Sequence, residues 1–226
     1  MTNDQRLHVA IIPDGNRRWA KAAGLLPWQG HSRAVENFTS LVEWAAKDGR
    51  IAALTIWCFS TENWKRDERE VNELMKLLAS YLEREGPALK KNRIHLVHSG
   101  RRDRLSEEMI ALIDRVSSET KDDPTMTLNL AIDYGGKDEV LRALKRMGPQ
   151  TMITEEQVRS FLDHPELRDI DLIIRTSGEQ RTSNFALWQS TYAEWMFSLK
   201  LFPEFLKEDL ADAVETFSKR NRRFGA

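Results

Sequence analysis

An arginine pair stands beside a carboxylate and a turn glycine near the start of the chain. Asp14 and Gly15 precede Arg17 and Arg18, directly after an apolar run. Guanidinium groups and the free backbone N–H groups of a helix N-terminus both bind phosphate, and a carboxylate beside phosphate oxygens can hold a magnesium ion. The same residues also suit an ordinary Asp-Gly turn with solvated arginines. This segment indicates an anion site without establishing one.

A second arginine-rich segment begins at Arg175, again directly after an apolar run, and contains Arg181 and Ser183. Two guanidinium forks and a hydroxyl could meet on one anion, and Glu179 could orient one of the arginines. A surface network of ion pairs is the alternative, but it does not explain why these polar groups adjoin Phe185 and further aromatic residues. The pattern favours an anion site.

A third polar segment follows an apolar run in the first half of the chain and leads into a helical pattern. Its hydroxyls, amide and cation could hold a diphosphate or relay a proton. Taken alone, it is also what a helix-capping loop looks like, so it becomes informative only beside the other two segments. Its sequence is Ser60-Thr61-Glu62-Asn63-Trp64-Lys65-Arg66.

The elements that must position these segments alternate between two kinds. Short β-rich apolar runs are separated by longer stretches of helical period, which is typical of βαβ units around a mostly parallel sheet. We therefore predict a single α/β domain over residues 1–226, with an open six-stranded sheet flanked by helices. Ligands bind outside the carboxyl ends of such strands, where the three polar segments lie. The strands are expected at residues 7–12, 53–59, 94–99, 126–131, 172–175 and 195–199.

The helical periods indicate amphipathic helices packed on the sheet. Apolar residues recur at helical spacing in two stretches, 35–45 and 71–82. Thr154 and Gln157 fit a capping box that opens a short helix through Phe161.

Composition excludes several other classes of protein. The 34 basic residues are balanced by 35 acidic ones, which argues against a nucleic-acid partner bound through a global positive field. The single cysteine, Cys58, cannot form an internal disulfide, so we expect a reducing, cytoplasmic setting. No signal peptide is evident, and no apolar run approaches the ~20 residues that cross a bilayer. Any membrane association is expected to be peripheral and to arise only through a lipid product.

Several motifs in this order and spacing resemble the cis-prenyltransferase family, which includes undecaprenyl diphosphate synthase. The resemblance extends from His8 to Gly225. It implies an undecaprenyl diphosphate synthase-like fold and a magnesium-dependent enzyme that joins isopentenyl diphosphate to an allylic diphosphate. It also implies a homodimer, in which the terminal Arg223-Phe224-Gly225 completes the site across the interface. The matching motifs are residues 8–20, 30–31, 59–66, 134–136, 175–185, 192–194 and 223–225.

The resemblance also implies roles for individual residues. Asp14 would lie between the allylic diphosphate and magnesium, Glu194 would be a second metal-linked carboxylate, and Asn63 would take part in removing a proton from isopentenyl diphosphate. Within the substrate-binding set, Arg175, Arg181 and Ser183 match the groups that hold isopentenyl diphosphate. The full set is Gly15, Asn16, Arg17, Arg18, Trp19, His31, Ser60, Thr61, Glu62, Trp64, Arg66, Arg175, Arg181, Thr182 and Ser183.

The chain departs from the family pattern at a few positions. Pro27 stands where many members have an arginine of the allylic site, and Asp133 replaces the common asparagine before Tyr134. These departures concern the allylic substrate and the product length. An irregular, lavandulyl-type coupling on the same fold is therefore an alternative, and a non-catalytic subunit is a weaker one, because Asp14 and the arginines are retained. A nucleotide-binding oxidoreductase would need a Gly-x-Gly-x-x-Gly turn after the first strand, which is lacking.

Overall fold

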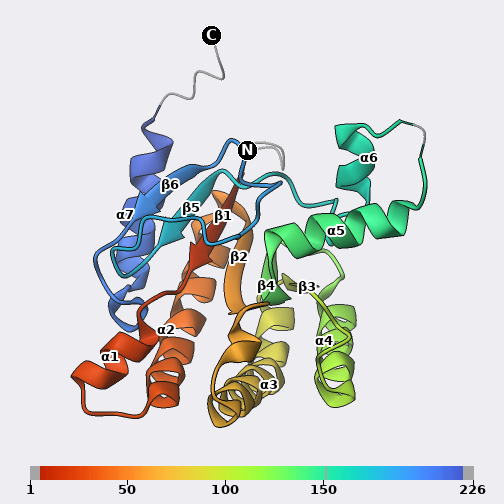
Figure 1. The fold of residues 1–226 in the computed structure, drawn as a ribbon. Helices are drawn as coiled ribbons and strands as arrows, with labels where there is room; N and C mark the ends of the chain where they lie inside the picture. The colour runs from red at the N-terminus through yellow and green to blue at the C-terminus, as the bar shows by residue number, and fades with distance from the viewer. Residues whose placement is uncertain (1–5, 151, 221–226) are drawn as a thin grey trace.

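Six strands form the centre of the computed structural model, which describes residues 6–150 and 152–220. Their order across the sheet is β3-β4-β2-β1-β5-β6, and every neighbouring pair is parallel. The predicted open, six-stranded parallel sheet is confirmed (Figure 1). The strands are β1 (Leu7–Ile12), β2 (Ile51–Ser60), β3 (Ile94–Ser99), β4 (Met126–Tyr134), β5 (Leu172–Arg175) and β6 (Glu194–Phe197).

Helices lie on the connections between successive strands from β1 to β5. One group, α2, α3 and α4, lies together below the sheet in Figure 1, whereas α5 and α6 lie apart from it at the upper right. The α-helices are α1 (Asn16–Ala22), α2 (Pro27–Asp48), α3 (Glu68–Lys91), α4 (Glu107–Thr120), α5 (Gly136–Met147), α6 (Glu155–Ser160) and α7 (Lys207–Ser218), and the short 3₁₀ turns are η2 (Asn63–Lys65) and η3 (Phe202–Glu204).

Alternation along the central strands divides the core between the two faces of the sheet. Val9 and Ile11 of β1 join a large apolar cluster with residues of α2, α3, α4 and α7, while Ala10 and Ile12 join a smaller cluster on the other face with Phe185. Successive side chains of a strand point to opposite faces, so a central strand buried on both sides is largely apolar. This is why β1 is apolar from Val9 to Ile12, and its buried His8 is hydrogen-bonded to Thr55 and to the Arg168 carbonyl.

The predicted elements match the structure well, with differences at some ends. β2 and β4 run further than predicted because they pair with each other as far as Ser60 and Tyr134. β6 ends at Phe197, two residues early, because its partner β5 ends at the opposing Arg175. The capping box is confirmed, although α6 ends one residue before Phe161.

Pro27 is the first residue of α2, the position where a fixed φ and a missing N–H suit a helix start. It thus has a plain structural role in this chain.

The register of the central strands brings the three polar segments to one edge of the sheet. β1 pairs with β2 on one side and with β5 on the other, and Ile12 lies opposite Arg175. The residues that follow β1, β2 and β5 therefore emerge side by side at the carboxyl edge, where parallel sheets bind their ligands.

Candidate active site

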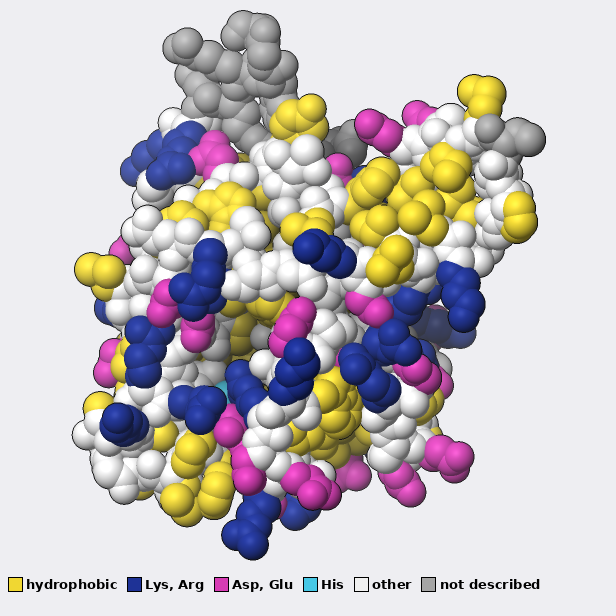
Figure 2. Space-filling model, in the orientation of Figure 1, with side chains coloured by type: hydrophobic (Ala, Val, Ile, Leu, Met, Phe, Trp, Pro, Cys, Tyr) yellow, Lys and Arg dark blue, Asp and Glu magenta, His cyan; other side chains and the backbone are white. Residues whose placement is uncertain are grey.

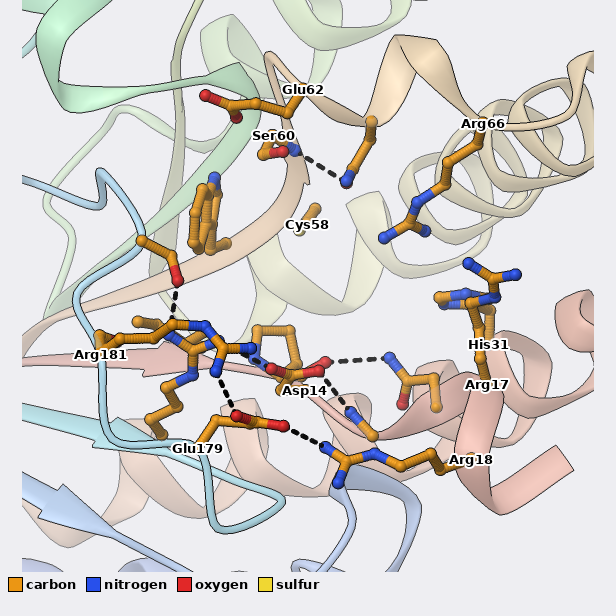
Figure 3. Close-up of a pocket in the computed structure, with 18 residues that line it drawn as sticks. Asp14, Arg17, Arg18, His31, Cys58, Ser60, Glu62, Arg66, Glu179 and Arg181 are labelled. Atoms are coloured by element: carbon orange, nitrogen blue, oxygen red, sulfur yellow. Dashed lines mark hydrogen bonds and ion pairs between the residues drawn. The ribbon is translucent and has the colours of Figure 1, made fainter. Parts of the chain in front are cut away.

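A polar cavity of about 700 Å³ lies at this carboxyl edge (Figure 3). It is walled by the turn after β1 with the start of α1, by the loop after β2, and by the loop after β5. The three polar segments of the sequence are thus brought together around one space. The predicted site residues that line it are Asp14, Gly15, Asn16, Arg17, Arg18, His31, Ser60, Glu62, Asn63, Arg66, Arg175, Arg181 and Ser183.

An ion pair between a buried arginine and a partly exposed carboxylate ties the first segment to the last. The Nη2 of Arg175 donates to the Oδ2 of Asp14 at 2.8 Å, and the backbone N–H of Gly15 donates to the Oδ1 at 2.8 Å. The side chain of Arg175 is 4% exposed, whereas that of Asp14 is 34% exposed and faces the cavity. Arg175 also donates to the hydroxyl of Ser183 at 2.8 Å and to the carbonyl of Arg181. Arg175 therefore fixes both Asp14 and the loop after β5.

Glycine is required at position 15 by its backbone and by its neighbours. Its φ of +102° lies in the left-handed region, and a Cβ there would come within 2.8 Å of Leu201. The tight turn aims the N-terminus of α1 and the Asp14 carboxylate at the cavity.

Two exposed arginines share one carboxylate on the open side of the cavity. Glu179 accepts from Arg181 and lies 3.4 Å from the Nη2 of Arg18, which also donates to the Ser177 hydroxyl at 2.5 Å. The side chains of Arg18 and Arg181 are 51% and 62% exposed. The suggested role of Glu179 in orienting an arginine agrees with this geometry, which leaves guanidinium donors free for an anion.

A buried carboxylate that the sequence analysis did not identify, Glu70, lies beside Arg17, Arg66 and His31 at the polar cavity. Glu70 of α3 is only 4% exposed, and its Oε1 lies 3.2 Å from Arg66 Nη1, 3.7 Å from Arg17 Nε and 4.0 Å from His31 Nε2. It therefore orients Arg17 and Arg66, with His31 beside them, towards the cavity. The four-residue spacing between Arg66, just before α3, and Glu70 in its first turn was the signal that could have found it.

His31 stands in this cluster as a neutral side chain. Burial, together with the nearby positive charges of Arg66 and Arg17, lowers the pKa of His31 to about 4. Within residues 6–150 and 152–220, its buried Nε2 has no hydrogen-bond partner. An anion near His31 would offset the positive charges and favour its protonation.

The loop after β2 is tied to its neighbours by side-chain amides. The Oδ1 of Asn63 accepts from the backbone N–H of Ser60 at 3.0 Å, and the Nδ2 of Asn184 donates to Glu62 at 3.3 Å. The Oδ1 of Asn184 accepts from the backbone N–H of Lys137 at 2.8 Å, and its backbone carbonyl accepts from the N–H of Gly136 at 2.6 Å. These bonds hold the loops after β2, β4 and β5 against one another.

Some predicted site residues do not line the polar cavity: Trp19, Thr61, Trp64, Thr182 and Glu194. Glu194 begins β6 opposite Leu172, three positions before the residue that faces Arg175, and it accepts from Arg220 at 2.6 Å. Within one chain the structure does not bring it to Asp14, so its role as a metal ligand stays a prediction. Residues 223–225 lie outside the described part of the chain.

A metal ion at Asp14 would need ligands from elsewhere. In the described part of the chain, no three or more His, Cys, Asp or Glu side chains gather into a group that could hold one. Magnesium commonly binds through one or two carboxylates and completes its shell with substrate phosphates and water. The half-exposed Asp14 beside several arginines fits that arrangement.

An apolar cavity of about 70 Å³ opens from the polar one, between α2 and α3. The two cavities share Pro13, Asn16, His31 and Cys58, so these residues form the neck between them. Burial raises the pKa of the Cys58 thiol to about 12, which agrees with apolar surroundings. Neither Pro27 nor Trp28 lines either cavity.

Further along the apolar cavity, the rings of Phe38 and Tyr81 pack with centroids 4.9 Å apart. Both side chains are buried. Together, the two cavities suit a ligand with an anionic head and a hydrocarbon tail.

An open parallel sheet with a cationic cavity that continues into an apolar one defines the class as an α/β enzyme for phosphorylated, hydrocarbon-bearing substrates. Residues 12–225 match the family described as "Putative undecaprenyl diphosphate synthase". The chain belongs to this family, the isoprenyl transferases, and is a prenyl-transferring enzyme. No helix of the described residues is long and apolar enough to cross a membrane.

Curated relatives and solved structures agree on the family. An isoprenyl transferase of Thermotoga maritima is 45% identical over 96% of each chain, and one of Aquifex pyrophilus is 45% identical over 96% of this chain and 95% of its own. The structure of lavandulyl diphosphate synthase from Lavandula x intermedia, in complex with dimethylallyl diphosphate, matches with a TM-score of 0.92 and 33% identity over 98% of this chain and 99% of that one. A probable undecaprenyl diphosphate synthase from Campylobacter jejuni matches with a TM-score of 0.82 and 34% identity over 97% of this chain and 98% of that one.

Proposed function

We propose that this enzyme condenses isopentenyl diphosphate with an allylic prenyl diphosphate, releases pyrophosphate and forms a Z double bond. The observation that carries the proposal is the single space formed by an arginine-rich cavity and an apolar cavity joined at His31 and Cys58. A prenyl diphosphate has the matching polarity, with its diphosphate on the arginines and its hydrocarbon between α2 and α3.

The two substrates would divide the polar cavity between them. The allylic diphosphate would bind at the start of α1, near Arg17, Arg18 and His31. Isopentenyl diphosphate would bind at Arg181 and Ser183, on the loop after β5. Asp14 and Arg175 form an ion pair between these two subsites. Both reacting groups would thus meet beside Asp14.

The proposed reaction requires charge stabilisation at the allylic subsite and proton removal at the isopentenyl diphosphate subsite. As the allylic C–O bond breaks, negative charge grows on the departing pyrophosphate, and the arginines stabilise that charge more than they stabilise the ground state. Magnesium, which Asp14 would hold together with diphosphate oxygens, adds Lewis-acid stabilisation. The isopentenyl double bond forms the new C–C bond, and a proton leaves beside Asn63 and Ser60 to restore neutrality.

An irregular coupling, in which an allylic diphosphate is the nucleophile, is the second candidate. The structural likeness to lavandulyl diphosphate synthase supports it. Against it stands the complete set of Arg175, Arg181 and Ser183 around the second subsite, together with Asn63 on the facing loop. Head-to-tail condensation needs both of these features.

We also propose that the protein works as a homodimer in the cytoplasm. Figure 2 shows a gathering of hydrophobic side chains over α5 at the upper right. Its members are large and exposed, a composition typical of an interface. Cys58 is the one cysteine of the chain and is partly buried, which is consistent with a reducing compartment. The exposed residues are Leu141, Leu144, Met152, Ile153 and Phe161.

The test is product identification. Purified protein would be incubated with isopentenyl diphosphate and a panel of allylic diphosphates, and the products identified by mass and by double-bond geometry. We expect linear products with new Z double bonds, no turnover in EDTA, and recovery on adding magnesium. Branched products formed from allylic diphosphate alone would favour irregular coupling, and full activity in chelator would defeat the magnesium assignment.

A further inference from the structure

Arg104 lies outside the polar cavity, on the connection between β3 and α4, yet it contacts the loop that carries Asn63. We propose that Arg104 is a positioning residue that holds the turn of Asn63 and Trp64 in place for proton removal. This inference rests on the function proposed above. Neither composition nor the motifs of the chain single out Arg104.

One side of Arg104 is fixed by Asp133, the residue that departs from the family pattern. Asp133 is 0% exposed and has a left-handed backbone with a φ of +54°. The Nε of Arg104 donates to its Oδ2 at 2.8 Å, and the Nη2 donates to its Oδ1. Such a two-point fork fixes the plane of the guanidinium as well as its position.

The other side of Arg104 rests on Trp64. Its guanidinium carbon lies 5.6 Å from the centre of the Trp64 ring, within the range of a cation–π contact. The opposite neighbour of Trp64 is the buried Phe59 of β2, with ring centroids 5.1 Å apart in an edge-to-face arrangement. Trp64 is therefore held between a strand of the sheet and an arginine that the sheet itself anchors through Asp133 of β4.

The loop on either side of this turn has further anchors: the backbone N–H of Thr61 donates to the Tyr134 carbonyl at 3.2 Å, Asn184 donates to Glu62 at 3.3 Å, and Arg66 donates to Glu70 at 3.2 Å. The Trp64 ring itself is held by Phe59 and Arg104. η2 is a single 3₁₀ turn, and the backbone bonds that close it, from Lys65 to Glu62 at 3.2 Å and from Arg66 to Asn63 at 3.0 Å, are internal to the loop. Because Trp64 directly follows Asn63, a shift of its ring would move the Asn63 amide relative to the cavity. A misplacement of this kind lowers the rate of the chemical step more than it weakens substrate binding.

A variant must separate this positioning role from stability. Arg104→Met alone leaves the buried Asp133 carboxylate without a partner and is expected to lower the Tm. Adding Asp133→Asn removes that unpaired buried charge, and asparagine tolerates the left-handed backbone at this position. The double variant should therefore regain a Tm close to that of the wild type while still lacking the guanidinium over Trp64.

Kinetics of the double variant give the first test. We expect kcat to fall on the order of tenfold or more, with the KM of isopentenyl diphosphate changed less than about twofold. The deuterium isotope effect measured with isopentenyl diphosphate labelled at C2 should rise as proton removal becomes slower. Arg102→Met is the matched control, because Arg102 lies two positions before Arg104 and its side chain forms an exposed ion pair with Asp114, away from Trp64, and it should leave kcat unchanged. Recovery of kcat together with the Tm would reduce Arg104 to a structural role and overturn the proposal.

A readout without turnover separates this proposal from the proposed function. In protein labelled with 5-fluorotryptophan, the ¹⁹F resonance of Trp64, assigned with Trp64→Phe, should shift or broaden in the double variant but not in Arg102→Met. An unchanged Trp64 resonance would overturn the positioning role whatever the activity. A changed resonance in an enzyme that forms no prenyl product would instead leave the contact standing and remove the proposed function.

Discussion

Asp14 provides a carboxylate at the centre of the proposed active site. Its carboxylate is held by Arg175 and by the backbone N–H of Gly15, and it still faces the cavity. Asp14→Asn preserves the shape and an acceptor for Arg175 but removes the negative charge. We expect kcat to fall about a hundredfold or more, because charge at the breaking bond acts chiefly in the transition state.

The measurement for Asp14→Asn is steady-state turnover with saturating substrates and magnesium. Asp114→Asn is a suitable control, since Asp114 forms only an exposed ion pair with Arg102. Turnover close to that of the wild type would remove Asp14 from the mechanism.

Arg18 and Arg181 form a natural pair for testing the two diphosphate subsites, because both contact the same carboxylate, Glu179. Arg181→Ala should raise the KM of isopentenyl diphosphate, and Arg18→Ala that of the allylic substrate, each by about tenfold or more, since a charged hydrogen bond contributes roughly 1.5–3 kcal/mol. Steady-state kinetics with each substrate varied in turn would measure this. Equal effects on both substrates in either variant would show that the proposed division of the cavity is wrong.

Arg175 should behave differently from Arg181. It is buried and binds Asp14, Ser183 and the Arg181 carbonyl at once. Its loss should therefore lower kcat as well as raise KM.

The positions of individual site residues could be predicted where a polar residue follows an apolar run. Asp14, Ser60 and Arg175 stand next to apolar runs, and parallel strands end at one edge, so their meeting follows from the fold. Glu70 was missed because an acidic residue in the first turn of a helix is usually a solvated favourable charge, and only tertiary packing buries it. Arg104 was missed for a related reason, since its contacts with Asp133 and Trp64 join residues far apart in the sequence.

At the scale of elements, pairing rather than pattern sets the ends of the strands. Apolar runs located every strand, but β4 continues through Asp133 to Tyr134 because β2 runs beside it to Ser60. The polar Asp133 breaks the apolar pattern and is skipped in the register between the pairs Phe59–Ile132 and Ser60–Tyr134, and Arg104 balances its charge. The end of β4 therefore cannot be predicted from the sequence of that strand alone.

The packing of α2 against α3 shapes the apolar cavity, and Phe38 and Tyr81 pack against each other in its wall. Tyr81→Ala should enlarge this cavity and shift the products towards longer chains, provided that the hydrocarbon occupies it. The buried ring also stabilises the fold, so we expect a loss of roughly 3–5 kcal/mol in the free energy of unfolding. Mass analysis of the products under fixed substrate ratios measures the shift.

Met75→Ala is the matched control for Tyr81→Ala. Met75 lies on the same helix but faces a groove shared with α4, outside the apolar cavity. It should destabilise the protein without changing product length. An unchanged product distribution in Tyr81→Ala would place the hydrocarbon chain elsewhere.

The charges of the whole molecule nearly balance, but positively charged side chains gather around the polar cavity. The chain has 34 basic and 35 acidic residues, but the polar cavity is lined by the five arginines 17, 18, 66, 175 and 181 against the three carboxylates of Asp14, Glu62 and Glu179. Glu70, behind Arg17 and Arg66, adds a fourth carboxylate, so the fold leaves a local excess of one positive charge at the carboxyl edge of the sheet. A cleft with such an excess attracts an anionic substrate.

The exposed apolar side chains over α5 and α6 form an apolar patch on the face of the molecule that Figure 2 shows. Leu141 is 66% exposed and Leu144 36%, and they lie three residues apart on α5, so they share one side of the helix. If this surface is where two copies of the chain meet, Leu141→Asp would place a charge in the interface, where its desolvation opposes association. We expect the variant to elute as a monomer in size-exclusion chromatography with light scattering, under conditions where the wild type is a dimer. Leu26→Asp is the control, because Leu26 is 53% exposed at the distant start of α2 and should leave the mass unchanged. A Leu141→Asp protein that remains dimeric would move the interface to another surface, and a monomeric wild type would end the homodimer proposal.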